Sequence, residues 1–136
     1  MTPDEARVFL RTNHNAVLAT FRRDGRPQLS PVTAGVDDDE RVEISTRETA
    51  IKVKNLRRDP RISLCLLNPG FYGEWGQVEG TAEIVDQPEA LELLVGYYRR
   101  ISGEHPDWDE YRQAMIDEKR VLVRFAIDRA GPTVEG

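Results

Sequence analysis

The chain has 136 residues, a length typical of one domain, so residues 1–136 are expected to fold as a single unit. With 39 % hydrophobic and 32 % charged residues, a charged first segment and only short apolar runs, the sequence argues against a membrane span or a signal peptide and favours a cytoplasmic location. The net charge of -5 argues against general nucleic-acid binding, the single cysteine excludes an intrachain disulfide, and the two histidines lie too far apart for a metal motif.

A short helix is predicted at the start of the chain. Thr2 is a suitable N-cap, Pro3 fits the first helical position, and Glu5 completes a capping box. We expect this helix to end at about Arg11.

Three strands are predicted next, at residues 15–21, 27–36 and 41–46. Asp24-Gly25 is a strong hairpin signal between the first two. Pro27 and Pro31 should confine the second strand to a sheet edge or make it irregular, because proline cannot donate to a neighbouring strand.

A second short helix is predicted within residues 47–60. Ala50, Val53 and Leu56 recur at helical spacing, and Asp59-Pro60 should end the helix.

The second half of the chain is predicted to hold three more strands and two helices. The strands are expected at residues 61–67, 74–86 and 120–128, and the helices at residues 87–101 and 107–118. Gly76 and Gly80 indicate a bulge or tight bend in the strand at 74–86. Asp107 and Glu110 form a capping pair for the last helix. The predicted fold class is therefore mainly β with flanking helices (α+β), with a six-stranded sheet curled into a small barrel.

Four segments resemble one known family in their order along the chain. They are "VLATFRRDGRPQLSPV", "KVKNLRRDPRISL", "WGQVEGTAEIVD" and "GEHPDWDEYRQAMIDEKRVLVRFAID". Together they are similar to the FMN-binding split β-barrel proteins related to pyridoxamine 5'-phosphate oxidase, over roughly residues 6–130. The "HPDWDEYRQAM" segment is most similar to the actinobacterial branch that binds the deazaflavin coenzyme F420. The resemblance implies a homodimer with a cofactor groove between the subunits.

The resemblance implies a phosphate seat around Lys52, which matches the family's phosphate-contacting lysine. A helix N-terminus and a nearby lysine both attract an anion, although a solvated surface lysine is the alternative. Ser45 and Thr46 lie at the junction between strand and helix, where they could contact the cofactor or cap the helix. The family often has an arginine where this chain has Ala50, so Arg47 or Lys54 would have to replace it.

The resemblance also implies residues around the cofactor ring. These are Gln28, Leu29, Ser30, Pro31, Val32, Asn55 and Trp75. Alone, Ser30 would be an ordinary strand residue, Asn55 could satisfy a helix end, and Trp75 could pack in the core or at a dimer interface.

Other polar residues are interpreted structurally. Arg57, Arg58 and Arg61 are expected in salt bridges on the surface, near the negative end of the helix dipole. His105 and Trp108 are expected to fix the start of the last helix. Cys65 is expected to be a small buried apolar residue.

The resemblance implies an oxidoreductase that transfers a hydride from reduced F420 to a conjugated small-molecule acceptor. No catalytic side chain or metal site is predicted, because the cofactor carries the chemistry. An FMN-binding oxidoreductase of the same fold and a non-catalytic cofactor or pigment binder are the alternatives.

Overall fold

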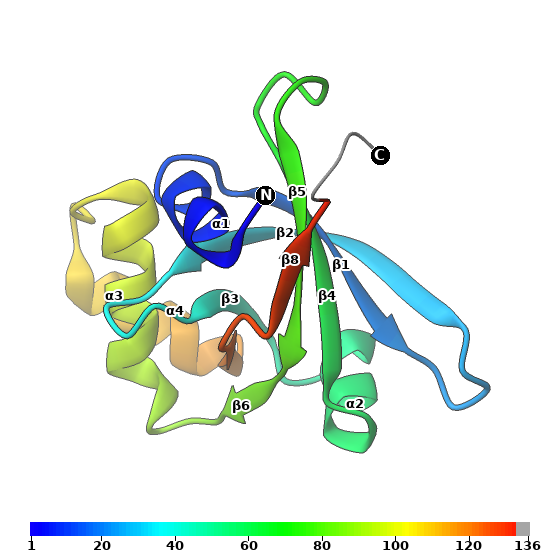
Figure 1. Cartoon of the computed structure of the whole chain (residues 1–136). Coiled ribbons are helices and arrows are strands. Elements are labelled where there is room, and N and C mark those ends of the chain that lie inside the picture. The colour runs from blue at the N-terminus through cyan, green and yellow to red at the C-terminus, as the bar shows by residue number, and fades with distance from the viewer. Residues whose placement is uncertain (133–136) are drawn as a thin grey trace.

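The computed structural model describes residues 1–132, which form four helices and eight strands (Figure 1). The helices are α1 (Pro3–Leu10), α2 (Ile51–Arg58), α3 (Ala90–Ser102) and α4 (Trp108–Asp117). The strands are β1 (Asn15–Phe21), β2 (Pro27–Val36), β3 (Val42–Arg47), β4 (Arg61–Leu67), β5 (Trp75–Thr81), β6 (Glu83–Val85), β7 (Arg120–Phe125) and β8 (Arg129–Gly131).

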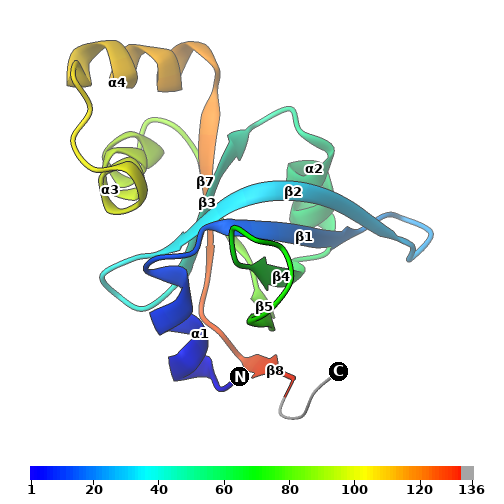
Figure 2. The same cartoon turned by 90° about the horizontal axis from the view of Figure 1, so that it is seen from above.

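The strands form one strongly curved sheet in the order β6-β7-β3-β2-β1-β4-β5-β8, with antiparallel neighbours throughout. Figure 2 shows α3 and α4 beside β3 and β7, and α2 on the side of β1 and β4. This half-barrel with flanking helices confirms the predicted mainly β class.

The predicted count of six strands is wrong, because eight are present in residues 1–132. The strand predicted at 74–86 is divided at Ala82 into β5, which pairs with β4 and β8, and β6, which pairs with β7. The chain passes too close to the end of β7 for a side chain at Gly80: a Cβ there would lie 2.4 Å from the Ala126 carbonyl oxygen and 2.6 Å from the Phe125 ring. The eighth strand, β8, has only three residues and therefore no alternating pattern to reveal it.

The prediction that β2 is an edge or irregular strand also needs correction. β2 lies inside the sheet, between β1 and β3. Its segment from Pro27 to Thr33 pairs with β1, whereas its pairing with β3 begins only at Ala34. Both prolines therefore lie where, within residues 1–132, the strand has a neighbour on one side only.

Two apolar clusters fill the fold. The larger one lies inside the curved sheet and includes Leu18, Ile44 and Leu64, each at most 1 % exposed. The second lies between α3, α4 and β7 and is centred on Leu94 and Leu122.

Local signals define the helix ends as expected. The capping box of α1 is confirmed, since the Thr2 hydroxyl accepts from the Glu5 amide and the Glu5 carboxylate accepts from the Thr2 amide. α1 ends at Leu10, with Arg11 as its C-cap. Asp107 caps α4 by accepting a hydrogen bond from the Glu110 amide at 3.1 Å.

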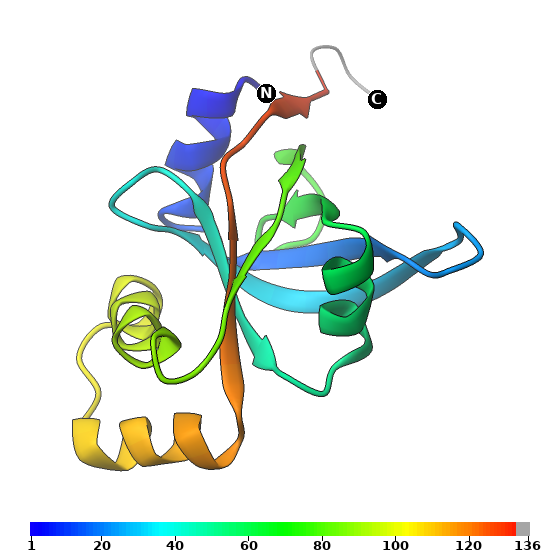
Figure 3. The same ribbon diagram turned by 90° about the horizontal axis from the view of Figure 1, so that it is seen from below.

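Two polar contacts fix α3 to the sheet. Arg100 donates to both carboxylate oxygens of the buried Glu43 in β3, at 2.8 and 2.9 Å. The Tyr97 hydroxyl donates to the Thr33 carbonyl oxygen in β2 at 2.7 Å. These contacts join α3 to β2 and β3, and Figure 3 shows α3 beside these strands and β7. None of the helices within residues 1–132 combines the length and apolar character that crossing a bilayer requires.

Candidate functional site

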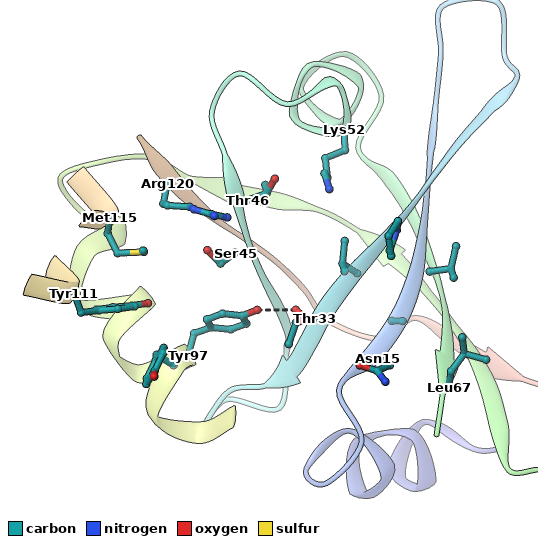
Figure 4. A pocket seen from close by; sticks show the side chains of 15 residues that line it. Asn15, Thr33, Ser45, Thr46, Lys52, Leu67, Tyr97, Tyr111, Met115 and Arg120 are labelled. Atoms are coloured by element: carbon teal, nitrogen blue, oxygen red, sulfur yellow. Dashed lines mark hydrogen bonds between the residues drawn. The ribbon is translucent and has the colours of Figure 1, made fainter. Parts of the chain in front are cut away.

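A cleft lies between the α3–α4 pair and the strands, with α2 at one end (Figure 4). Its volume is about 640 Å³, a size suited to a small molecule or cofactor. It is lined by Asn15, Ala16, Val17, Pro31, Val32, Thr33, Ser45, Thr46, Lys52, Leu67, Tyr97, Tyr98, Tyr111, Met115 and Arg120.

One end of the cleft is cationic. Lys52 lies in the first turn of α2, and Arg120 is the first residue of β7; Figure 4 shows both side chains directed toward Thr46 and Ser45. The lining contains no aspartate or glutamate. This end therefore offers two positive charges and two hydroxyl groups to a ligand, a donor set that suits an anion.

Lys52 is partly buried, and among residues 1–132 no carboxylate lies within ion-pair distance of it. Burial, and to a smaller extent the positive charge of Arg120, lowers the pKa of the Lys52 ammonium. No side chain caps the N-terminus of α2, so the helix dipole adds to the positive potential here.

The opposite wall is aromatic. Tyr97, Tyr98 and Tyr111 line it together with Met115. Tyr97 and Tyr111 each donate to a backbone carbonyl, and burial raises the pKa of both phenols to about 12. These two hydroxyls are therefore fixed and neutral at physiological pH.

The Tyr98 ring lies at the centre of an aromatic cluster. Its ring centre is 4.9 Å from Tyr111, 5.2 Å from His105 and 5.7 Å from Trp108. His105 and Trp108 therefore support Tyr98 and Tyr111 from behind the cleft lining.

The strand side of the cleft is mainly apolar. Val17 comes from β1, Pro31 from β2 and Leu67 from β4, with the polar Asn15 and Thr33 beside them, whereas Ala16 and Val32 pack mainly against the core. A flat ring could lie against these side chains while its anionic group reaches Lys52 at the other end.

Five of the ten residues predicted for the site line this cleft. They are Pro31, Val32, Ser45, Thr46 and Lys52. The alternative that Ser45 and Thr46 cap a helix is wrong, because both lie in β3 and α2 has no side-chain cap. Lys52 is partly buried, which does not fit a fully solvated surface lysine.

The other five predicted residues do not line the cleft. Asn55 is buried and donates to the Thr20 hydroxyl, which in turn donates to Gln28, so these side chains tie α2 to β1 and β2. Leu29 is 63 % exposed on β2. Trp75 begins β5 and lies beside Gln77, Glu79 and Arg129, away from the cleft.

Ser30 is a special case among these five. Its hydroxyl oxygen is buried and has no hydrogen-bond partner within residues 1–132. An unpaired buried hydroxyl is uncommon in proteins.

Neither candidate for the missing arginine lies in the cleft. Arg47 is 60 % exposed and pairs with Glu118 at 3.2 Å. Lys54 faces a separate shallow cleft that also contains Arg22, Arg23 and Arg58.

The structural interpretations of the other polar residues can now be compared with the structure. Arg57 pairs with Asp86 and Arg61 with Asp59, as expected for salt-bridged surface residues. Arg58 differs, since it donates to the Phe21 carbonyl and to the Asn55 side chain.

The roles expected for the residues before α4 are confirmed, and that of Cys65 is only partly correct. The His105 ring accepts from the Asp107 amide at 2.9 Å, and the Trp108 indole donates to Glu104 at 2.9 Å. Cys65 is only partly buried, and burial raises the pKa of its thiol.

Sequence reasoning missed the aromatic wall and Arg120. In the sequence, Tyr98 belongs to the apolar stripe of a helix and Arg120 is the outermost residue of a strand, so neither has a local feature that indicates a ligand. The pairing of β3 with β7 brings Arg120 to the cleft, and that pairing joins segments more than 70 residues apart.

Comparison with known proteins places the chain in a family. The structure is similar to that of the conserved hypothetical protein Rv2991 from Mycobacterium tuberculosis, with 31 % identity, a TM-score of 0.77, and coverage of 100 % of this chain and 93 % of that chain. It is also similar to a protein described as an F420 reductase, with 20 % identity, a TM-score of 0.70, and coverage of 91 % and 94 %.

A third similar structure is that of General Stress Protein 26 from Bacillus anthracis. It shares 16 % identity at a TM-score of 0.65, with coverage of 94 % of this chain and 90 % of that chain. The family model described as pyridoxamine 5'-phosphate oxidase matches residues 2–133, nearly the whole sequence. With its curved antiparallel sheet and flanking helices, the chain belongs to the pyridoxamine 5'-phosphate oxidase family of split-barrel proteins.

Proposed function

We propose that this protein is an oxidoreductase that binds coenzyme F420 and reduces a conjugated small-molecule acceptor. The observation that carries the proposal is the cleft, which combines a carboxylate-free cationic end with an apolar and aromatic body. The similarity to a protein described as an F420 reductase supports the choice of cofactor.

The cationic end fits a phosphate group. Lys52 would contribute a positive charge, and the hydroxyls of Ser45 and Thr46 would donate hydrogen bonds to phosphate oxygens. A bound anion would also favour the charged form of Lys52, whose pKa is lowered by burial and, to a smaller extent, by the positive charge of Arg120.

The body of the cleft fits a flat tricyclic ring. Val17, Pro31 and Leu67 offer an apolar surface on the strand side, and Tyr98 and Tyr111 line the cleft from the helices. A ring held between these walls would be contacted on two sides, while the open side of the cleft would leave room for an acceptor.

When bound in its reduced form, F420 would supply the hydride that the acceptor receives. The protein's own contribution would be to hold the phosphate at Lys52, orient the ring, and leave room for the acceptor beside it. Because the phenols of Tyr97 and Tyr111 are fixed to backbone carbonyls and have raised pKa values, neither is poised to donate a proton.

The first test is binding of oxidised F420 and, separately, of FMN, each followed by fluorescence. Lys52→Ala should weaken binding about tenfold or more, because it removes a charge-assisted contact. Lys54→Ala is the matched control, since Lys54 lies on the same helix but faces a different cleft. Its affinity should stay within about twofold of the wild type.

The outcomes separate the competing functions. Tight F420 binding that depends on Lys52 and not on Lys54, with weak FMN binding, is the expected result. Tight FMN binding instead would favour the flavoprotein alternative. Absence of binding to either cofactor would contradict the proposal. Consumption of reduced F420 by a panel of conjugated acceptors would then distinguish a reductase from a non-catalytic carrier.

We also propose that two copies of the chain associate as a homodimer. Apolar side chains of the β1, β2, β4 and β5 strands stay partly uncovered on the outer face of the sheet, among them Leu29 at 63 % and Trp75 at 38 % exposure. A second copy on this face would bury them and narrow the cleft along its β1 and β4 side. Light scattering after gel filtration should give twice the chain mass, and Leu29→Lys should shift the mass toward one chain.

A further inference from the structure

We propose that Arg120 supplies the second positive charge of the phosphate site and that Glu118 positions it. This inference rests on the proposed function, because it assigns a further ligand to the same anionic group. It concerns residues for which the sequence offered no binding signal.

The register of the sheet sets the position of Arg120. Arg120 and Arg47 are directly opposite each other on β7 and β3, so their side chains start on the same side of the sheet. Their surroundings differ, since the Arg120 side chain is 27 % exposed and lines the cleft, whereas that of Arg47 is 60 % exposed and does not.

Glu118 anchors Arg120 by one edge only. A single carboxylate oxygen of Glu118 accepts from Nε and Nη2 of Arg120, at 3.1 and 3.0 Å, and from Nη2 of Arg47 at 3.2 Å. Within residues 1–132, the remaining amino group of Arg120, Nη1, has no protein partner. The guanidinium is therefore held in place while one of its N–H edges is free for a ligand.

The tight turn before β7 fixes the start of this strand. Lys119 has a φ of 52°, in the left-handed region, and its carbonyl oxygen accepts from the Glu48 amide at 2.9 Å. This contact ties the start of β7 to the segment between β3 and α2, so Arg120 and Lys52 are carried by segments that are joined directly.

The electrostatics of the cleft favour an anion between these two residues. Both residues line the same cleft, and the lowered pKa of Lys52 comes from burial and, to a smaller extent, from the positive charge of Arg120. Figure 4 shows the Arg120 guanidinium directed toward Thr46, between β7 and the Lys52 ammonium. Glu118 already pairs with Arg120, whereas Lys52 has no carboxylate partner within residues 1–132, so a bound anion would supply the compensating charge for Lys52.

The test compares Arg120→Gln with Arg47→Gln as a matched control. Both variants remove an arginine bonded to Glu118, but only Arg120 lines the cleft. The probes are F420 and its ribityl chromophore without the phosphate, together with FMN and riboflavin. Each pair consists of a phosphorylated probe (F420 or FMN) and its counterpart without phosphate. In the pair that the protein binds, Arg120→Gln should weaken binding of the phosphorylated probe about ten- to a hundredfold. The unphosphorylated member should change by less than about twofold, and Arg47→Gln should leave both within about threefold.

Two further variants separate binding from structure. Arg120→Lys should recover part of the affinity for the phosphorylated probe, because it retains the charge without the planar fork. Glu118→Gln should weaken that affinity by less than Arg120→Gln, because Arg120 stays charged but loses its anchor. Thermal unfolding of each variant confirms that it is folded.

Equal losses for the phosphorylated and unphosphorylated probes would overturn the assignment, and so would equal losses in Arg120→Gln and Arg47→Gln. If the wild type bound neither cofactor, the proposed function would fail separately. The same variants would then be compared by the rise in Tm that inorganic pyrophosphate produces. A rise that is lost in Arg120→Gln but kept in Arg47→Gln would support the anion site, and equal rises in both would refute it.

Discussion

The close approach at Gly80 leads to a sharp prediction about stability. A Cβ at this position would lie 2.4 Å from the Ala126 carbonyl oxygen and 2.6 Å from the Phe125 ring, where ordinary contact begins near 3.4 Å. β5 and the segment after β7 would have to separate by about 1 Å, since backbone cannot rotate away as a flexible side chain can. Overpacking of this kind costs about 1–3 kcal/mol, so we expect Gly80→Ala to lower the free energy of unfolding by roughly 2 kcal/mol.

Gly76 provides a matched control on the same strand. A Cβ there would meet Met1 Sδ at 2.4 Å and Met1 Cε at 3.0 Å, which belong to a flexible side chain, and the Gly131 carbonyl at 3.3 Å, only slightly inside ordinary contact. Alanine also restricts the unfolded chain, which favours folding by about 0.4–1 kcal/mol. Gly76→Ala should therefore stay within roughly 1 kcal/mol of the wild type.

Urea unfolding, followed by tryptophan fluorescence, measures both variants. With a slope of about 2 kcal/mol per molar urea, Gly80→Ala should move the midpoint down by about 1 M. Equal midpoints for Gly80→Ala and the wild type would show that the strands can separate without cost. A larger loss in Gly76→Ala than in Gly80→Ala would refute the reasoning from backbone contact.

Three more predictions follow from buried and partly buried charges. Because the pKa values of Tyr97 and Tyr111 are about 12, the unfolded chain loses these protons first, and stability should fall between pH 10 and 12 by roughly 2–3 kcal/mol per tyrosine. Urea unfolding across this range should show a shallower fall in Tyr97→Phe. Arg100→Met should lower the free energy of unfolding by about 3 kcal/mol, because it leaves the Glu43 carboxylate, which is 2 % exposed, without its partner. Glu43→Gln should lower it by less. In a double-mutant cycle, the double variant Glu43→Leu/Arg100→Met should recover stability. Cofactor affinity, measured by fluorescence against pH, should fall as pH rises through the lowered pKa of Lys52, at a lower pH than for an ordinary lysine. Lys52→Arg should remove this fall, because arginine stays protonated in this range.

Much of the fold could be predicted because its signals are local. The capping box at Thr2, the Asp24-Gly25 turn and the apolar stripes of the helices each lie within a few residues. The division of the strand at Ala82 could not be predicted in the same way. It accompanies a change of pairing partner, from β4 and β8 to β7, and β7 and β8 lie far from this segment in the sequence.

The candidate site was predictable only in part, for the same physical reason. Ser45, Thr46 and Lys52 lie in one continuous segment, so a single motif could indicate all three. Arg120 and Tyr111 reach the cleft only through tertiary structure. For Asn55 the reverse holds, because a motif position suggested a ligand contact, but the side chain faces Thr20 and Arg58.

The central place of β7 has a consequence for how the protein is made on the ribosome. β7 lies between β3 and β6, so β3 lacks one of its neighbours until residues 120–125 have been synthesised. Until then the nascent chain presents an unpaired strand edge, which is the kind of surface that recruits chaperones or pairs with other chains. The cationic end of the cleft is completed in the same late step, because Arg120 is the first residue of that strand. A chain released before residue 120 would therefore have Lys52 but no cleft around it.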